Sequence, residues 1–227
     1  MAQHRSFTTA AGTAHVLFTD RQDGDFQLDG DPWLREAAAR RLVDLPWSWV
    51  RQVHRADVVV VGEPGGGQGQ DGDGLVTTVA GAVLSVRGAD CPMVGFVSSE
   101  GVVGVAHAGW RGLLAGVLEQ TVSTMRDQGA TAVSALLGPC ISPAHYAFGP
   151  EDLDRLTARF GPTVRATTAA GRPAADLLAA VACALQPLAV VLDTTTHRCT
   201  ARDGAYFSHR ARGELGRQTT AVWLAPP

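Results

Sequence analysis

The stretch Val102–Gly116, with the sequence V-V-G-V-A-H-A-G-W-R-G-L-L-A-G, is the part of the chain that most restricts its fold. It opens with a short run of valine, glycine and alanine, as a buried strand does, and this strand is expected to end at His107. Gly109 then permits a sharp turn, and Arg111 opens a pattern of apolar residues at helical spacing. A scaffold of this kind fixes the side chain at the strand end, and it leaves the first N–H groups of the helix free to bind an anion.

This junction between strand and helix predicts chemistry at two residues. His107 can act as a metal ligand or as a base, and Arg111 can hold a carboxylate or phosphate through two parallel hydrogen bonds. A core histidine beside a surface arginine is the alternative. Two further strand ends upstream, at His54 and Cys91, favour the functional interpretation.

Length and charge limit the class of protein. A chain of 227 residues that is 45% hydrophobic can bury a substantial core, and we expect residues 1–227 to fold as a single domain. The net charge of -3 gives no reason to expect nucleic acid or an anionic membrane as a partner. No apolar run reaches the length of a membrane span and the N-terminal residues lack a signal-peptide pattern, so the sequence predicts a cytoplasmic protein. Both a monomer and a homodimer fit the sequence.

Strand-like and helix-like patterns follow one another without strict alternation. We therefore expect an α+β (mixed α/β) fold, with a mixed β-sheet core covered by helices, more than a doubly wound parallel sheet. Strands are expected at residues 15–19, 47–53, 58–61, 75–78, 82–86, 93–97, 102–106, 133–137, 189–192 and 220–224, and helices at 33–43, 113–127, from 150 onward and at 174–185.

A glycine-rich segment, Gly62–Gly74, contains seven glycines between two expected strands. It lacks the G-K-S or G-K-T ending of a phosphate-binding loop and the G-x-G-x-x-G pattern of a dinucleotide-binding helix. We interpret it as a mobile loop near the rim of a site.

Three residues at expected strand ends or turns carry nitrogen or sulfur donors: His54, Cys91 and His107. Their separations of 37 and 16 residues exclude a zinc-finger knuckle, in which paired ligands lie about two to five residues apart. Three protein ligands with an open fourth position are typical of catalytic zinc, and the same donors also suit copper. The alternatives are a metal-free Cys-His nucleophilic site and a buried thiol beside two ordinary histidines.

Short motifs occur in order along most of the chain. They are Q-V-H (52–54), D-G-L-V-T (73–77), A-D-C-P (89–92), H-A-G-W-R-G (107–112), G-P-C-I (138–141), Y-x-F-G (146–149) and F-S-x-R (207–210). Together they resemble the YfiH or laccase-domain family, whose members have been described as polyphenol oxidases, peptidoglycan editing factors and purine nucleoside phosphorylases. The combination of H-A-G-W-R-G with A-D-C-P is the most specific part of this resemblance.

The resemblance implies a zinc ion, or copper in its place, held by the residues His54, Cys91 and His107. It also implies phosphorolysis of adenosine, inosine and methylthioadenosine to the base and ribose 1-phosphate, with deamination of adenosine as a side activity. The partners are then a small nucleoside and phosphate. Copper-dependent phenol oxidation is the older assignment, and an effect on peptidoglycan from the cytoplasm is a third. A multicopper oxidase needs H-x-H pairs, and this chain has seven histidines and no such pair.

Four further residues are expected to complete the site. Arg111 is the first candidate for phosphate binding and catalysis, and Arg210 is the second. Cys140 is expected to line the site, with core packing or a nucleophilic role as alternatives. Asp90 either orients a ligand and contacts substrate or caps a turn. The chain departs from the family pattern at Gly88, where threonine is frequent, and at Ala39-Arg40, where Asn-Arg is frequent.

Overall fold

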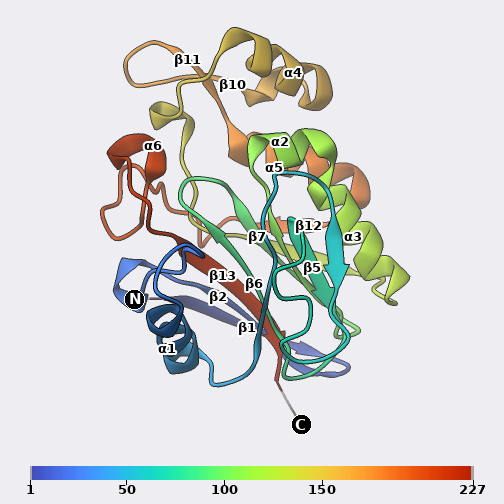
Figure 1. Ribbon diagram of the computed structural model, residues 1–227. Coiled ribbons are helices and arrows are strands. Elements are labelled where there is room, and N and C mark those ends of the chain that lie inside the picture. The colour runs from blue at the N-terminus through green and yellow to red at the C-terminus, as the bar shows by residue number, and fades with distance from the viewer. Residues whose placement is uncertain (1, 226–227) are drawn as a thin grey trace.

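Two mixed β-sheets pack face to face at the centre of the fold (Figure 1). The computed structural model describes residues 2–225. In spatial order, the five-stranded sheet contains β1 (Gln3–Thr9), β2 (Gly12–Phe18), β13 (Gln218–Leu224), β6 (Val83–Gly88) and β3 (Trp47–Trp49). The six-stranded sheet contains β12 (Val191–Asp193), β9 (Val133–Leu137), β7 (Met93–Ser98), β8 (Val103–His107), β5 (Gly74–Thr77) and β4 (Val58–Val60).

Side-chain alternation decides how each sheet faces its partner. In β2, Ala14, Val16 and Phe18 are buried at every second position and pack toward the six-stranded sheet. The central strands β7 and β8 are buried on both faces, which is why their sequences are nearly continuous apolar runs. The expected mixed core covered by helices is confirmed.

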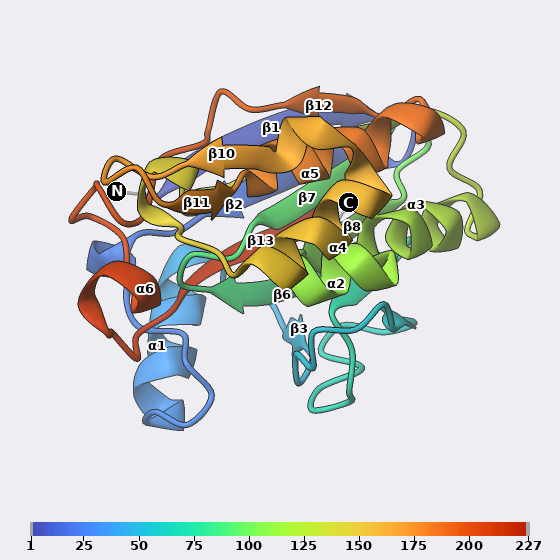
Figure 2. The same cartoon turned by 90° about the horizontal axis from the view of Figure 1, so that it is seen from above.

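Helices cover the outer faces of both sheets, and Figures 1 and 2 show α1 well apart from the group α2–α5. That group packs on the six-stranded sheet, whereas α1 packs near the outer face of the five-stranded sheet. Within residues 2–225, no helix is both long and apolar enough to cross a membrane. The helices are α1 (Pro32–Leu42), α2 (Trp110–Ala115), α3 (Val117–Asp127), α4 (Pro150–Phe160), α5 (Leu177–Leu185) and α6 (His209–Arg212), and β10 (Arg165–Thr167) pairs with β11 (Pro173–Ala175).

Helix starts follow local signals that the sequence already contains. The Asp31 carboxylate accepts a hydrogen bond from the Trp33 backbone N–H at 2.8 Å, and Pro32 occupies the first position of α1. The Asp176 side chain accepts one from the Ala179 N–H at 3.0 Å at the start of α5. Such caps supply partners for the N–H groups that a helix start leaves free.

Two expected elements are shorter or broken. The helix expected at 113–127 is two helices, α2 and α3, because Gly116 between them has a φ of 92° and interrupts the helical backbone. The strand expected at 47–53 ends at Trp49, because the chain beyond it pairs with the glycine-rich loop. There the Arg51 N–H donates to the Gln70 carbonyl at 2.7 Å.

Two further elements differ from expectation because strand pairing decides their structure. The strand β1 was not predicted, because its mostly polar residues lack the apolar alternation of a half-buried strand. It forms the edge of its sheet and pairs with β2 in a hairpin. The helix expected at 174–185 begins only at Leu177, because Pro173–Ala175 pairs with β10 instead.

Candidate metal centre

His54, Cys91 and His107 meet at one place although they are far apart in the sequence. Their donor atoms lie within 4.8 Å of one another, and the two imidazole rings stand edge to face with centroids 4.8 Å apart. His107 is the last residue of β8 and is buried, Cys91 lies between β6 and β7, and His54 follows β3 and is exposed. The centre is therefore anchored in the interior and open to solvent on the side of His54.

The Asp73 carboxylate positions both histidines. Its Oδ1 accepts a hydrogen bond from His107 Nδ1 at 2.9 Å, and its Oδ2 accepts from the backbone N–H groups of Val53 and Arg55 at 3.1 and 2.8 Å. These two N–H groups flank His54, whose φ of 59° is unusual for a residue other than glycine. Because Nδ1 of His107 is occupied, its Nε2 remains for a metal.

Sequence reasoning missed this role of Asp73, which entered only as the first letter of D-G-L-V-T. A usable signal was present, since metal-binding histidines usually donate their second ring N–H to a carboxylate. Burial alone would raise the pKa of Asp73, but hydrogen bonds from His107 and from backbone N–H groups outweigh it and lower that pKa. The carboxylate therefore stays ionised.

The same buried contacts shift the protonation of the two inner donors. Burial alone would raise the pKa of the Cys91 thiol, but hydrogen bonds to His107 and His54 outweigh it and lower that pKa. Burial would lower the pKa of His107, but Asp73 and Cys91 raise it. Cys91 is thus favoured as a thiolate, the form in which cysteine binds metals.

Gly109 provides the space in which the three donors meet. A Cβ atom at this position would lie 2.8 Å from Cδ2 of His54, 3.3 Å from Sγ of Cys91 and 3.4 Å from Cε1 of His107. The φ of Gly109 is -57°, which any residue can adopt. The chain turns from β8 into α2 at Gly109 as expected, but glycine is required there for space and not for its backbone conformation.

The donor set fits a metal ion. Bonds of about 2.0–2.3 Å to nitrogen and sulfur place tetrahedral ligands roughly 3.3–3.8 Å apart, which small side-chain rotations reach from the observed separations. No fourth His, Cys, Asp or Glu joins the group among the residues that the structure describes. A three-ligand site with an open side is the arrangement of catalytic metals, and its donors suit zinc or copper.

An aromatic layer lies beside the sequence-predicted arginines. The Arg111 guanidinium stands 4.3 Å from the ring centroid of Trp110, which contacts Phe148 edge to face at 5.3 Å. The Arg210 guanidinium stands 4.4 Å from the ring centroid of Tyr146, which lies 5.3 Å from the Phe148 ring. The two arginines are thus linked through three neighbouring rings.

Tyr146 lies within electrostatic reach of the centre. Burial raises the pKa of its phenol, the charges of Cys91 and Asp90 raise it further, and those of Arg210 and Arg111 lower it. Among residues 2–225, the hydroxyl of Tyr146 has no hydrogen-bond partner. From the sequence alone, Tyr146 stands out only as the first residue of the motif Y-x-F-G.

Asp90 holds the segment that carries Arg210. Its Oδ2 accepts from the Arg210 backbone N–H at 2.7 Å, and its Oδ1 accepts from the hydroxyls of Thr200 and Ser208 at 2.6 and 2.7 Å. Asp90 also has a φ of 96° and precedes Cys91 directly. Asp90 therefore binds a remote segment at the start of α6 instead of capping its own turn, and orienting a ligand or contacting substrate stays a prediction.

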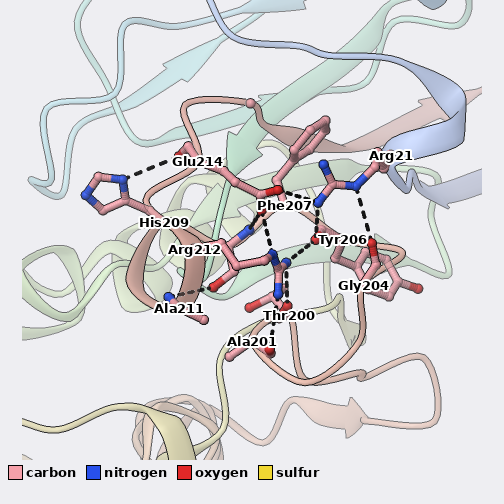
Figure 3. Close-up of polar contacts among 12 residues, drawn as sticks. Arg21, Thr200, Ala201, Gly204, Tyr206, Phe207, His209, Ala211, Arg212 and Glu214 are labelled. Carbon is pink, nitrogen blue, oxygen red and sulfur yellow. Dashed lines mark hydrogen bonds and ion pairs between the residues drawn. The ribbon is translucent and has the colours of Figure 1, made fainter.

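A second cluster rigidifies the same segment (Figure 3). Glu214 pairs with Arg21 at 2.7 Å and with Arg212 at 2.9 Å, and it accepts from the Ser208 N–H at 2.8 Å. Burial would raise the pKa of Glu214, but these three donors outweigh it and lower that pKa to about 2. Arg212 in turn donates to the carbonyls of Thr200 and Tyr206 at 3.1 and 2.5 Å.

The surroundings of Cys140 and Arg111 differ in part from those expected. Cys140 is fully buried in the core, and burial followed by the charge of Cys199 raises the pKa of its thiol, so it corresponds to the core-packing alternative and not to a catalytic thiol. Arg111 is exposed in α2, which has only six residues and no side-chain cap at its start, and anion binding by Arg111 stays a prediction.

The two-sheet fold and the open His-Cys-His group define a protein of the mixed α/β class with a candidate metal site. Comparison with known families agrees: residues 33–225 match the family described as multi-copper polyphenol oxidoreductase laccase. The chain belongs to this family, the YfiH or laccase-domain family.

Curated relatives in this family share one name. A protein of Mycobacterium tuberculosis is 36% identical over 226 residues, covering 96% of this chain and 90% of the relative. One of Streptomyces griseus is 35% identical over 246 residues, covering 99% of each. YfiH of Escherichia coli is 34% identical over 180 residues, covering 78% of this chain and 73% of the relative. All three are named purine nucleoside phosphorylases.

Solved structures show the same fold. A protein from Neisseria meningitidis superposes with a TM-score of 0.85 at 26% identity and covers 99% of both chains. YlmD from Geobacillus stearothermophilus superposes with a TM-score of 0.77 at 27% identity, covering 96% of this chain and 94% of its own. The expected fold class is confirmed by both.

Proposed function

We propose that this protein is a zinc-dependent purine nucleoside phosphorylase. It cleaves adenosine, inosine or methylthioadenosine with phosphate to the free base and ribose 1-phosphate, and it deaminates adenosine as a side activity. The proposal is supported by the shared name of relatives that match nearly the whole chain. The observation that carries it is the pair Arg111 and Arg210, which lie over the neighbouring rings of Trp110 and Tyr146, with Tyr146 within electrostatic reach of Cys91 in the open His-Cys-His centre.

The two guanidiniums are suited to bind the attacking phosphate. Phosphorolysis passes through a transition state with oxocarbenium character at the ribose, as glycoside cleavage does. Phosphate must then be held close to a developing positive charge, and arginine binds phosphate oxygens through two parallel hydrogen bonds. Arg210 is held in place by the Asp90 carboxylate through its backbone and by its own bond from Nη1 to the Ala147 carbonyl at 2.6 Å.

The aromatic layer is suited to the purine. Trp110, Phe148 and Tyr146 present flat apolar surface on which a base can stack. The Tyr146 hydroxyl stays protonated at neutral pH because its pKa is raised, so it can donate a hydrogen bond to the ring of the departing base. When bound at His54, Cys91 and His107, zinc supplies Lewis-acid chemistry.

The test measures products and metal together. The purified protein is analysed for metal content and incubated with inosine or adenosine, with and without phosphate. We expect base and ribose 1-phosphate to appear only when phosphate is present. His107→Ala should lower turnover by more than about 100-fold, because loss of a metal ligand should cost more activity than loss of a residue that only positions a ligand. His4→Ala, at an exposed histidine of β1, serves as the matched control and should keep full activity. Release of the base at the same rate with and without phosphate would contradict the proposal.

Copper-dependent phenol oxidation is the second candidate, favoured by the description of the family. Multicopper oxidation needs several metal sites, and the described part of the chain contains one group of three ligands. Dioxygen uptake with a phenol by the copper-loaded protein, without phosphorolysis by the zinc-loaded protein, would favour this candidate.

A further inference from the structure

A cavity of about 540 Å³ lies between α1 and the outer face of the five-stranded sheet. Its size is in the range of small-molecule sites, about 300–1,000 Å³. Arg35 and Ala39 of α1 form one wall, Trp49 of β3 another, and Ser85 and Arg87 of β6 the floor. The three metal donors and the arginines of the proposed phosphate site are absent from its lining, so the cavity is separate from the site described above.

The Arg87 guanidinium is buried in this floor without an anionic partner. The residue is only 8% exposed, and its Nη2 donates to the Val50 carbonyl at 2.5 Å. No carboxylate within residues 2–225 lies within 4.0 Å of it. A guanidinium has five N–H donors, and a buried unpaired cation is unfavourable. Burial, with the nearby charge of Arg35, lowers the pKa of Arg87 to about 10, so it remains charged at neutral pH.

Arg35 brings a second positive charge to the same cavity. The guanidiniums of Arg35 and Arg87 lie 5.9 and 5.5 Å from the ring centroid of Trp49. Arg35 is held by bonds from Nη1 to the carbonyls of Gln27 and Leu28, both at 3.2 Å. Like charges at one ring repel, and an anion between them removes this repulsion.

The acidic residues of the cavity lining do not neutralise Arg35 and Arg87. Glu36 is exposed and bonds Arg40 at 2.7 Å, and Asp44 is also exposed. Neither forms an ion pair with Arg87 or Arg35 among the described residues. The interior of the cavity is therefore cationic.

The remaining walls are flat and apolar. Phe26 and Trp47 lie nearly parallel with ring centroids 6.1 Å apart, and the indole N–H of Trp47 is already used by the Val43 carbonyl at 3.1 Å. The hydroxyls of Ser85 and Thr219 donate to backbone carbonyls at 3.0 and 2.8 Å. The guanidiniums thus bring charged N–H donors to the interior, and much of the remaining lining is aromatic or aliphatic.

We propose that this cavity is a second binding site, which takes a small aromatic anion with a phosphate or carboxylate group. The anionic group sits on Arg87 and Arg35, and the ring lies against Trp49 and Trp47. Guanidiniums bind both kinds of anion through paired N–H donors, and indole rings bind flat apolar groups. The proposal does not depend on the phosphorylase activity.

Calorimetric titration of the metal-loaded protein tests it, with phenyl phosphate and benzoate as probes and with inorganic phosphate and benzyl alcohol as half-probes. We expect at least one full probe to bind, each half-probe to bind at least about tenfold more weakly, and Trp fluorescence to change on binding. The better probe then distinguishes a phosphate from a carboxylate ligand. Binding should persist in Arg111→Gln, which separates this cavity from the metal centre.

Two variants decide the assignment. Arg87→Met keeps the volume and removes the charge, so affinity should fall at least about tenfold. The free protein should melt at the same or a higher temperature, because the unpaired buried cation is gone. Arg40→Gln, at an exposed arginine on the cavity mouth, should change affinity less than about twofold. Unchanged affinity in Arg87→Met, or no binding of either probe up to about 10 mM, overturns the proposal.

Discussion

Two residues that are not metal donors themselves, Gly109 and Asp73, shape the candidate metal centre. Gly109 leaves the volume in which the three donors meet. Asp73 orients both histidines, by accepting hydrogen bonds from the His107 ring and from a backbone N–H next to His54. Both residues lie outside the ligand set itself. Asp73 bonds His107 at 2.9 Å, and a Cβ atom at position 109 would come within 2.8–3.4 Å of all three donor side chains, so a change at either residue is transmitted to the donors.

Gly109→Ala should weaken metal binding without unfolding the protein. The added Cβ would come within 2.8 Å of the His54 ring, so this ring must move out of the geometry that a metal requires. Gly149→Ala is the matched control, because Gly149 also precedes a helix with a φ of -68° and has open space around its Cβ. Zinc content after dialysis, with circular dichroism for the fold, measures the effect. Equal zinc content in the two variants would contradict this role of Gly109.

At the scale of elements, the segment around α6 is fixed by charges and not by its own helix. The helix α6 has only four residues, yet Asp90, Glu214 and Arg212 bond its backbone and its flanks. Figure 3 shows Arg21 reaching in from the N-terminal part of the chain to join them. This network holds Arg210 beside Tyr146, so stability of the segment and phosphate binding are coupled.

Glu214→Gln should lower the free energy of unfolding by about 1–3 kcal/mol at pH 7, since the carboxylate serves charged donors. The folded pKa of about 2 lies below the ordinary value of 4.5, so the stabilisation is complete above about pH 4.5 and is lost as the pH falls toward 2. Urea unfolding at pH 7 and pH 3.5 should show the difference between wild type and variant shrinking at the lower pH. Glu36→Gln, at an exposed pair in α1, should change stability by less than about 1 kcal/mol at either pH.

At the scale of the whole molecule, the three metal donors come from both sheets. His54 follows a strand of the five-stranded sheet, His107 ends a strand of the six-stranded sheet, and Cys91 lies on the connection between the two. An ion bound by all three therefore joins the sheets at one edge of their shared core. Metal binding and global stability should be linked.

Zinc should raise the melting temperature of the metal-free protein. A free concentration of 100 times Kd corresponds to about 2.7 kcal/mol, or roughly 5–10 °C for a chain of this size. Asp73→Asn removes the negative charge that holds both histidines and should weaken zinc binding about 10–100-fold. At the same zinc concentration, the melting temperature of this variant should therefore rise less than that of the wild type. Asp71→Asn, on the same loop but paired with exposed Arg51, should behave as wild type. Equal shifts in the two variants would show that Asp73 does not support the site.

The sequence by itself determined much of the local structure and identified the three candidate metal donors. The strand at Val133–Leu137 has the bounds that its apolar run predicts, and α1 begins at Pro32, one residue before the expected start, where Asp31 caps it. His107 could be selected because a buried strand ends there and a turn follows. These features depend on neighbours along the chain, which the sequence displays directly.

Only the tertiary structure decided what surrounds the donors. Asp73 reaches His107 because β5 and β8 pair with Gly74 opposite Ala106, a register that no local pattern specifies. The crowding at Gly109 and the buried charge of Arg87 beneath α1 likewise depend on segments distant in sequence. Burial and turn signals are local, whereas sheet register and the contacts between layers are set by packing of the complete chain.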